Sequence, residues 1–362
     1  MTTLPIFRAM SRPARAAATF VLAMATVTIV GHPLNPDLPP TLIFGLSALS
    51  ILGLAWLIGQ ATERLGEITG PQVGGILNAT FGNIAELIIA FFALQAGLID
   101  VVKASLTGSI IGNLLLVLGL SVLVGGLRNG RQTFSREVAG SNAALLVLAA
   151  ISLLIPAVLA FSSSTSGGRV IEDSVLVSVF LIVGYVLSLV YQFRNPPPGS
   201  EADRETDSDG WTGREAATVL VGAAVLLAIL SEILVGAIEP VVETVGLTTF
   251  FVGVIVLPVI GNLAEQLVAV QLAFKNRMQF SMAVSYGASL QVALFVAPAL
   301  VLLGVLTGHE MNLVFAPLEV AAVVAAVGIS ALIALDGESN WLEGALLTIV
   351  YLILAAAFFE LR

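Results

Sequence analysis

Long apolar stretches alternate with short polar segments along the whole chain. Eleven of these stretches are long enough to cross a bilayer, which takes about 20 helical residues per crossing. They cover residues 14–31, 39–61, 71–95, 103–126, 138–161, 171–193, 213–236, 247–274, 280–304, 312–334 and 341–359. In lipid only helices and closed barrels satisfy their own backbone hydrogen bonds. The pattern therefore predicts an all-α membrane protein with eleven transmembrane helices.

Composition and charge agree with a membrane location. The chain is 57% hydrophobic and only 11% charged, and its net charge of −9 gives no reason to expect a nucleic-acid partner. Basic residues favour the cytoplasmic side of a membrane. If the N-terminus is cytoplasmic, all of the 15 Lys and Arg residues except Lys103, Arg169 and Arg362 fall on that side. We therefore expect the N-terminus inside and the C-terminus outside a bacterial cytoplasmic membrane, with the first helix retained.

A short acidic motif occurs twice. Residues 82–86 read Gly-Asn-Ile-Ala-Glu, and residues 261–265, at an offset of 179, read Gly-Asn-Leu-Ala-Glu. The same offset carries Gly108 onto Gly287, and in both halves this glycine follows the motif glycine by 26 residues. A duplicated acidic motif within apolar segments is typical of transporters built from repeats.

The polar stretch 194–212 divides the chain into an N-terminal segment with helix 1 (1–38), a first repeat (39–193) and a second repeat (213–362). Its prolines, glycines and acidic residues predict a cytoplasmic linker. Each repeat holds five predicted helices. An odd number makes the second repeat enter the membrane from the opposite side, so the sequence predicts two inverted repeats.

The repeated glutamates, Glu86 and Glu265, fall in the middle of predicted helices. A charge at mid-bilayer costs about 2.5–3.5 kcal/mol on insertion scales, so such residues mark function unless a cation pairs with them. Basic residues are almost absent from the helix interiors. The plainer alternative is a protonated carboxyl that donates to a backbone carbonyl. Gly82, Pro258 and Gly261 are expected to weaken the helices just before the acids and free backbone carbonyls.

Other polar residues share helix faces with the two acids or lie on the matching helices 4 and 9. The amides Asn83 and Asn262 lie three residues before the glutamates, on the same helix face, and are candidate ligands. The residues expected to line the cavity are Asn78, Thr80, Ser109, Asn113, Gln266, Ser289 and Gln291. Serines and glycines at such places also serve close helix packing. Glu232, Glu319 and Glu343 lie nearer helix ends and are alternative positions on a proton route.

All of these donors are oxygens, which favours calcium, since it takes 6–8 oxygen ligands in flexible geometry. There is no cysteine, and the two histidines, His32 and His309, fall in predicted outer loops, so soft metals are poor candidates. No glycine precedes a lysine, so a nucleotide-binding loop of the Walker type is absent from the sequence. Two buried carboxylates would take up protons when calcium leaves, which couples the two ions. Calcium is then a transported substrate, and no cofactor is expected.

These residues also resemble the cation/proton exchangers of the calcium/cation antiporter superfamily. The resemblance runs from about Leu65 to the C-terminus and is carried by residues 74–88, 103–109, 252–265, 275–278, 287–291 and 336–344. It implies that Glu86 and Glu265 bind calcium and compete for protons. Two positions depart from the family pattern. Gln266 stands where the family usually has a histidine, and Ala288 stands where it often has a serine.

The sequence thus favours a secondary-active calcium/proton antiporter that works by alternating access. A monovalent sodium or potassium/proton antiporter on the same frame is the alternative, although two acids would overcharge a site for one sodium ion. A cation channel is less favoured because no filter-like loop is apparent. An enzyme is not expected, because no buried catalytic constellation is visible. The expected partners are calcium, protons and lipid, and the sequence leaves open a homo-oligomer.

Overall fold

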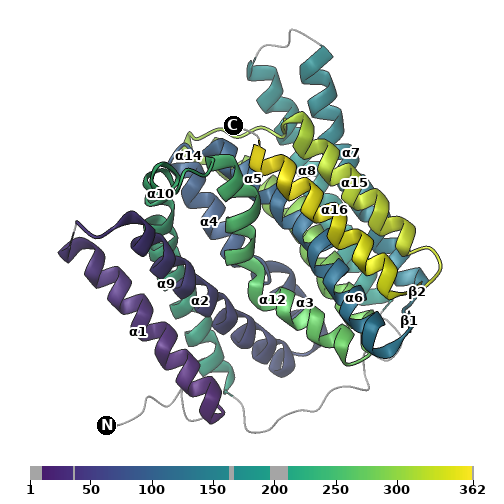
Figure 1. Ribbon diagram of the computed structural model, residues 1–362, viewed down its shortest axis with the longest axis horizontal. Coiled ribbons are helices and arrows are strands. Elements are labelled where there is room, and N and C mark those ends of the chain that lie inside the picture. The colour runs from purple at the N-terminus through teal and green to yellow at the C-terminus, as the bar shows by residue number, and fades with distance from the viewer. Residues whose placement is uncertain (1–9, 36, 163–166, 196–210, 361–362) are drawn as a thin grey trace. The chain divides into compact units, whose positions relative to one another are not determined.

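The structure is a computed structural model of the chain, described here for residues 10–35, 37–162, 167–195 and 211–360. It is predominantly helical (Figure 1). In the described residues, nine helices are long and apolar enough to cross a membrane, and Ile84–Gln95 and Pro317–Ile333 are shorter apolar helices. The chain is an integral membrane protein. It forms two compact units, residues Met1–Phe92 with Leu187–Gly246 and residues Ala93–Val186 with Leu247–Arg362.

Each predicted membrane segment coincides with helix. The first unit holds α1 (Arg12–Leu34), α2 (Pro40–Thr69), α3 (Pro71–Phe81), most of α4 (Ile84–Gln95), α9 (Gly213–Gly236) and α10 (Ile238–Val245). Helix α8 (Gly167–Arg194) is shared with the second unit. The predicted helix 71–95 is broken into α3 and α4, and α10 lies in a segment expected to be a loop. Most of the predicted linker, residues 196–210, lies outside the described residues.

The second unit holds the remaining elements. Its helices are α5 (Ile99–Ile111), α6 (Leu118–Asn129), α7 (Arg136–Ser162), α11 (Thr249–Phe251), α12 (Leu257–Phe274), α13 (Met278–Gln291), α14 (Ala297–Thr307), α15 (Pro317–Ile333) and α16 (Trp341–Glu360). Three π-helical segments, η2 (Gly112–Val117), η3 (Val252–Val256) and η4 (Val292–Val296), join α5 to α6, α11 to α12 and α13 to α14. The predicted helices 4, 8 and 9 are therefore continuous rods with one widened turn each, a feature that apolar periodicity does not reveal.

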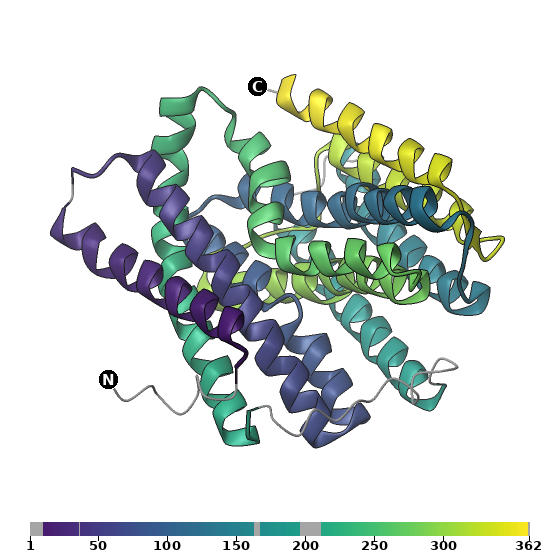
Figure 2. The same cartoon turned by 60° about the horizontal axis from the view of Figure 1, so that its bottom comes forward.

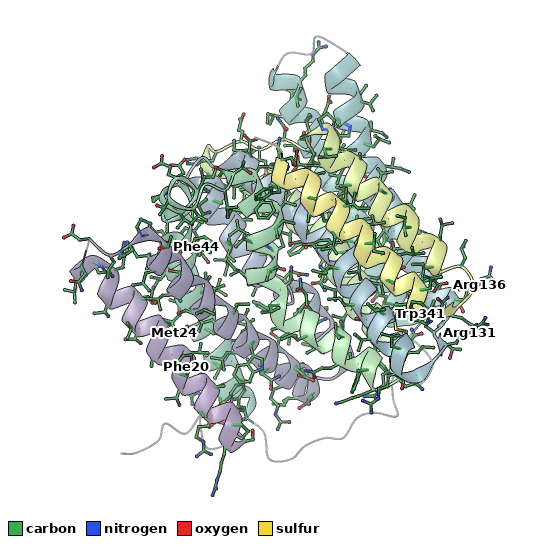
Figure 3. All side chains as sticks on the ribbon, in the orientation of Figure 1. Phe20, Met24, Phe44, Arg131, Arg136 and Trp341 are labelled. Atoms are coloured by element: carbon green, nitrogen blue, oxygen red, sulfur yellow. The ribbon has the colours of Figure 1, made fainter. Side chains whose placement is uncertain are left out.

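In the first unit α1, α2 and α9 lie side by side, as both ribbon views show (Figures 1 and 2). Helix α2 packs along α9, and Leu54 of α2 and Leu227 of α9 are fully buried. At Gly53 a side chain would collide with Val21 of α1, so the absence of one lets the two helices meet. Phe20 projects from α1 and is 65% exposed, as expected of a side chain that faces lipid (Figure 3).

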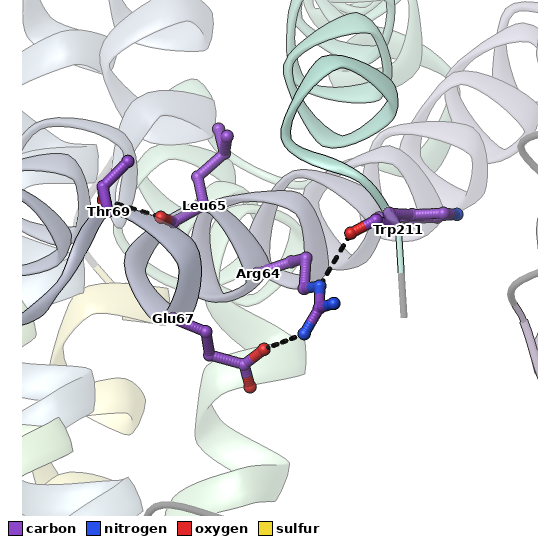
Figure 4. Close-up of polar contacts among 5 residues, drawn as sticks. All are labelled: Arg64, Leu65, Glu67, Thr69 and Trp211. Atoms are coloured by element: carbon purple, nitrogen blue, oxygen red, sulfur yellow. Dashed lines mark hydrogen bonds and ion pairs between the residues drawn. The ribbon is translucent and has the colours of Figure 1, made fainter. Parts of the chain in front are cut away.

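One polar contact ties the end of α2 to the residues that precede α9 (Figure 4). Arg64 Nε donates to the Trp211 carbonyl oxygen at 2.8 Å, and Arg64 Nη1 forms an ion pair with Glu67 Oε2 at 2.7 Å. The Trp211 residue is buried although it directly follows the undescribed part of the linker. Thr212 then caps α9 by accepting from the Glu215 N–H at 3.3 Å. The start of α9 is therefore fixed to α2.

In the second unit α6 packs against both α12 and α16, and α15 packs against α7 and α5. A side chain at Gly344 would meet the backbone of α6 at Leu123 N, only 2.2 Å away. Small residues of this kind let membrane helices approach closely. The rods α5–η2–α6 and α13–η4–α14 lie deepest, with Leu114, Leu118 and Leu294 fully buried.

The prediction of an all-α chain missed one small sheet. Strands β1 (Gln132–Thr133) and β2 (Glu338–Ser339) pair antiparallel, with Gln132 opposite Ser339. Figure 3 labels Arg131, Arg136 and Trp341 around this two-stranded sheet, beside the start of α16. Two-residue strands carry no alternation of apolar and polar residues, so the sequence gave no signal for them.

Candidate cation-binding site

The first acidic motif lies where a helix of the first unit is broken. Helix α3 ends at Phe81, Gly82 and Asn83 form a turn, and α4 begins at Ile84. Glu86 therefore lies in the first turn of α4, where unpaired backbone N–H groups favour negative charge. Asn83 and Glu86 are both buried. The predicted weak point at Gly82 is confirmed.

The two polar residues that precede this break are differently placed. Asn78 and Thr80 are exposed on α3, and the Thr80 hydroxyl donates to the carbonyl oxygen of Ile76 at 2.8 Å. Asn78 accepts the N–H of Gly82 on its carbonyl oxygen at 2.8 Å. The Thr80 hydroxyl is thus engaged within its own helix, and the role of both residues in lining a cavity stays a prediction.

The second motif lies in an unbroken helix of the second unit. Its distortion comes earlier, in η3, and α12 continues from Leu257 through Gly261 and Glu265. Pro258 has no N–H, so it cannot form the α-helical hydrogen bond to the Val254 carbonyl four residues before it. A widened turn at this point lets the chain bypass that missing donor. The sequence motif is therefore repeated, but the break at Gly82 has no counterpart at Gly261.

In the second unit a predicted ligand, Asn262, meets a predicted cavity-lining residue, Ser109, across two helices. Asn262 is 1% exposed, and its Nδ2 donates to Ser109 Oγ of α5 at 3.4 Å. Glu265 and Gln266 follow on α12 and are half-buried. Among the described residues, Nδ2 of the buried Asn113, in η2, has no hydrogen-bond partner. Asn262, Ser109 and Asn113 thus place neutral polar groups on the adjoining rods α12 and α5–η2, and their role in binding or lining a cation site stays a prediction.

The close approach of α5 and η3 depends on glycine. A Cβ built on Gly108 would lie 1.9 Å from the Val254 carbonyl oxygen and 2.7 Å from Pro258 Cγ. A Cβ on Gly253 would lie 2.7 Å from Ala104 Cβ. The two backbones therefore touch at the carbonyl that Pro258 leaves without its usual partner.

The matching residues of α13 are arranged differently from those of α5. Ser289 is fully buried, and its hydroxyl donates to the Ser285 carbonyl oxygen of the same helix at 3.0 Å. Gln291 is half-buried at the end of α13, directly before η4. Asn113, by contrast, is the second residue of η2, and the 179-residue offset matches it to Val292 and not to Gln291. A widened turn next to each polar residue is typical of functional sites in helices, and only the structure reveals it.

The sequence places Glu319 near a helix end and offers it only as an alternative position on a proton route. The structure buries it to 2% exposure in the first turn of α15, where Oε2 accepts from the Ala316 N–H at 2.8 Å and Oε1 accepts from Thr107 Oγ1 at 3.2 Å. The proline at position 317 and an acid at the third helical position form a signal that would have identified this helix start.

The described residues contain no cluster of three or more His, Asp or Glu side chains that could hold a metal ion. The family model described as sodium/calcium exchanger protein matches residues 39–194 and 215–360. The chain belongs to the sodium/calcium exchanger protein family. This match includes every residue of the predicted site and leaves out residues 195–214, close to the predicted linker.

Several relatives in this exchanger family are similar over nearly their whole length. A Ca2+/H+ antiporter of Aphanothece halophytica is 42% identical over 94% of this chain and 95% of its own length. A Ca2+/H+ antiporter of a Synechocystis strain is 46% identical over 88% of this chain and 91% of its own. The crystal structure of the Ca2+/H+ antiporter protein YfkE superimposes with a TM-score of 0.82, at 39% identity, over 96% of this chain and all of that one.

Proposed function

We propose that this exchanger-family protein is a secondary-active calcium/proton antiporter. The observation that carries the proposal is the near full-length similarity, at about 40% identity, to proteins named as Ca2+/H+ antiporters. The chemistry of the predicted site supports it independently. Every candidate ligand is a carboxylate or a side-chain amide, and both offer the oxygen atoms that calcium prefers. No observation favours the monovalent alternative.

We further propose that Glu86 and Glu265 bind calcium and protons in turn. Two carboxylates balance the charge of one calcium ion, and protons that bind the same oxygens compete with it. Asn83 and Asn262 would add amide oxygens, and the cavity-lining set would replace part of the hydration shell. The break at Gly82 and the widened turn before Pro258 support this assignment, because irregular helices are tolerated at membrane depth where they border a cavity or protein. Alternating exposure of the site to the two sides would then exchange one ion for the other.

The test is calcium uptake into proteoliposomes under an imposed pH gradient, with sodium and potassium gradients as rivals. The gradient should drive uptake without nucleotide. Liposomes that carry protein with Glu86→Gln and Glu265→Gln together serve as the matched control. Uptake that requires a sodium gradient and ignores the pH gradient would refute the proposal.

For the architecture we propose eleven membrane-spanning helices, with helix 1 preceding two inverted five-helix repeats at 39–193 and 213–362. The family match to two segments with nearly these bounds supports the division. We also propose a cytoplasmic N-terminus and linker. Because the chain has no cysteine, single cysteines report accessibility without background. An impermeant thiol reagent added to intact cells should label His309→Cys and spare Ser200→Cys. The reverse pattern would refute the orientation.

A further inference from the structure

A second polar cluster of the second unit lies on a face of α5 away from its contact with η3. Lys103 and Thr107 are one helical turn apart, so they share one face. The Lys103 ammonium donates to Asn312 Oδ1 and to the Val314 carbonyl oxygen, both at 2.7 Å. It also lies 5.9 Å from the centre of the buried Phe315 ring. The irregular segment between α14 and α15 is thus fastened to α5.

Glu319 continues this contact one turn further along α5. Its carboxylate accepts the Thr107 hydroxyl on one oxygen and the Ala316 N–H on the other. Within the described part of the chain, Lys103 and Glu319 form no direct ion pair. Each charged group instead has neutral hydrogen-bonding partners. The positive charge of the half-buried Lys103 and the negative charge of the buried Glu319 lie in the same polar cluster and offset each other. The other acids nearby, Asp100 and Glu310, are exposed.

Helix α5 is therefore supported on two sides. On one side Ala104 and Gly108 lie against the backbone of η3, and Gly108 also lies against the Pro258 ring of α12. On the other side Lys103 and Thr107 are held by the segment 312–319. The hydroxyl of Ser109, which meets Asn262 at 3.4 Å, is two residues from Thr107 on the same rigid helix. That contact is near the limit of a hydrogen bond, so a small retreat of α5 would break it.

We propose that Lys103, Thr107 and Glu319 are positioning residues of the transport site. They hold α5 against η3 and thereby keep Ser109 and Asn113 where they can serve calcium. This inference rests on the proposed function. None of the three residues contacts the ion. Glu319 acts as a fixed hydrogen-bond acceptor for Thr107 and Ala316, and not as a step on a proton route.

The decisive experiment compares two replacements of one side chain. Thr107→Val keeps the shape and removes the hydroxyl, whereas Thr107→Ser keeps the hydroxyl. Loss of a partner that orients metal ligands typically weakens metal affinity about 10–100-fold. We therefore expect Thr107→Val to raise the KM for calcium about tenfold, with a smaller change in maximal rate, and Thr107→Ser to stay near wild type. A KM for Thr107→Val that equals that of Thr107→Ser would overturn the proposal.

The role of the two charges is tested by measuring the KM for calcium of Glu319→Gln, Lys103→Met and the double variant. Glu310→Gln is the matched control, because Glu310 is an exposed acid of the same segment. Each single variant leaves one charge without its counterpart, the half-buried Lys103 or the buried Glu319, whereas the double variant removes both. The rise in KM for the double variant should therefore be smaller than the product of the two single rises. A merely structural role would lower the melting temperature and maximal rate in parallel and leave KM unchanged, and this result would overturn the proposal.

The wild-type protein in the same liposomes separates the two levels of inference. If wild type does not exchange calcium for protons, the proposed function fails. If wild type does so and the KM for calcium is indifferent to Thr107→Val and Glu319→Gln, only the positioning role fails.

Discussion

Replacing Gly108 with alanine tests how tightly the two backbones of the second unit meet. The added Cβ would lie 1.9 Å from the Val254 carbonyl oxygen and 2.6 Å from its carbon. Carbon–oxygen contacts of this kind are ordinarily no closer than about 3.3 Å. Helix α5 and η3 would therefore have to separate by about 1.4 Å, because the obstacle is backbone and cannot rotate away.

The magnitude follows from two opposing effects. Inserting a methyl group into a packed interior costs about 1–3 kcal/mol, and more where nothing can move aside. Alanine in place of glycine within a helix returns about 1 kcal/mol. Because the obstacle here is backbone, the upper end of the cost applies, and the balance is a net loss of about 2 kcal/mol. The same displacement would carry Ser109 out of reach of Asn262, because their 3.4 Å contact has little slack.

The sequence supplies a matched control. Gly287 occupies the same place in the second copy of the motif, but a Cβ added there meets no atom within 4 Å. Gly287→Ala should therefore be neutral or slightly stabilising through helix propensity alone. Thermal unfolding of the purified protein and the KM for calcium in proteoliposomes should separate the two variants. We expect Gly108→Ala to lower the melting temperature by at least about 2 °C and to raise KM. Equal behaviour of the two alanine variants would refute the close contact at Val254.

Three further results are expected. Glu86→Gln and Glu265→Gln should each nearly abolish calcium flux while the protein remains monodisperse on size exclusion. Glutamine matches the size of glutamate, but it carries no negative charge to bind calcium and exchanges no proton. Substantial residual flux in either variant would show that the replaced glutamate is not part of the site. Gln266→His should add a pH dependence of flux near pH 6.5, where an ordinary histidine titrates, and profiles that superimpose on wild type would place residue 266 outside the coupling site. Arg64→Met should lower the melting temperature more than Glu67→Gln. The first variant leaves the carbonyl oxygen of the buried Trp211 without its hydrogen-bond donor, whereas the second only breaks an exposed ion pair worth about 0–1 kcal/mol. A larger effect of Glu67→Gln would contradict this ranking.

The sequence alone determined the class of protein and the chemistry of its candidate ligands. Apolar length is a local property, and each of the predicted membrane segments coincides with helix in the structure. The duplicated motif singled out Glu86 and Glu265, and the family to which the chain belongs is the one that those residues resemble. Proline and glycine at 258 and 82 correctly marked irregular backbone, because their effect on a helix is intrinsic to the residue.

What the sequence could not determine depends on neighbours from distant parts of the chain. Gly108 and Gly287 hold the same place in the two copies of the motif, yet only Gly108 lies against another backbone. The pairing of Ser109 with Asn262, and the burial of Glu319 against Thr107, join residues 153 and 212 positions apart. The break at Gly82 and the unbroken helix through Gly261 likewise arise from one repeated motif. Local sequence specifies what a residue can do, whereas packing against other helices decides which of those possibilities is used, because contact, burial and backbone approach are properties of two segments and not of one.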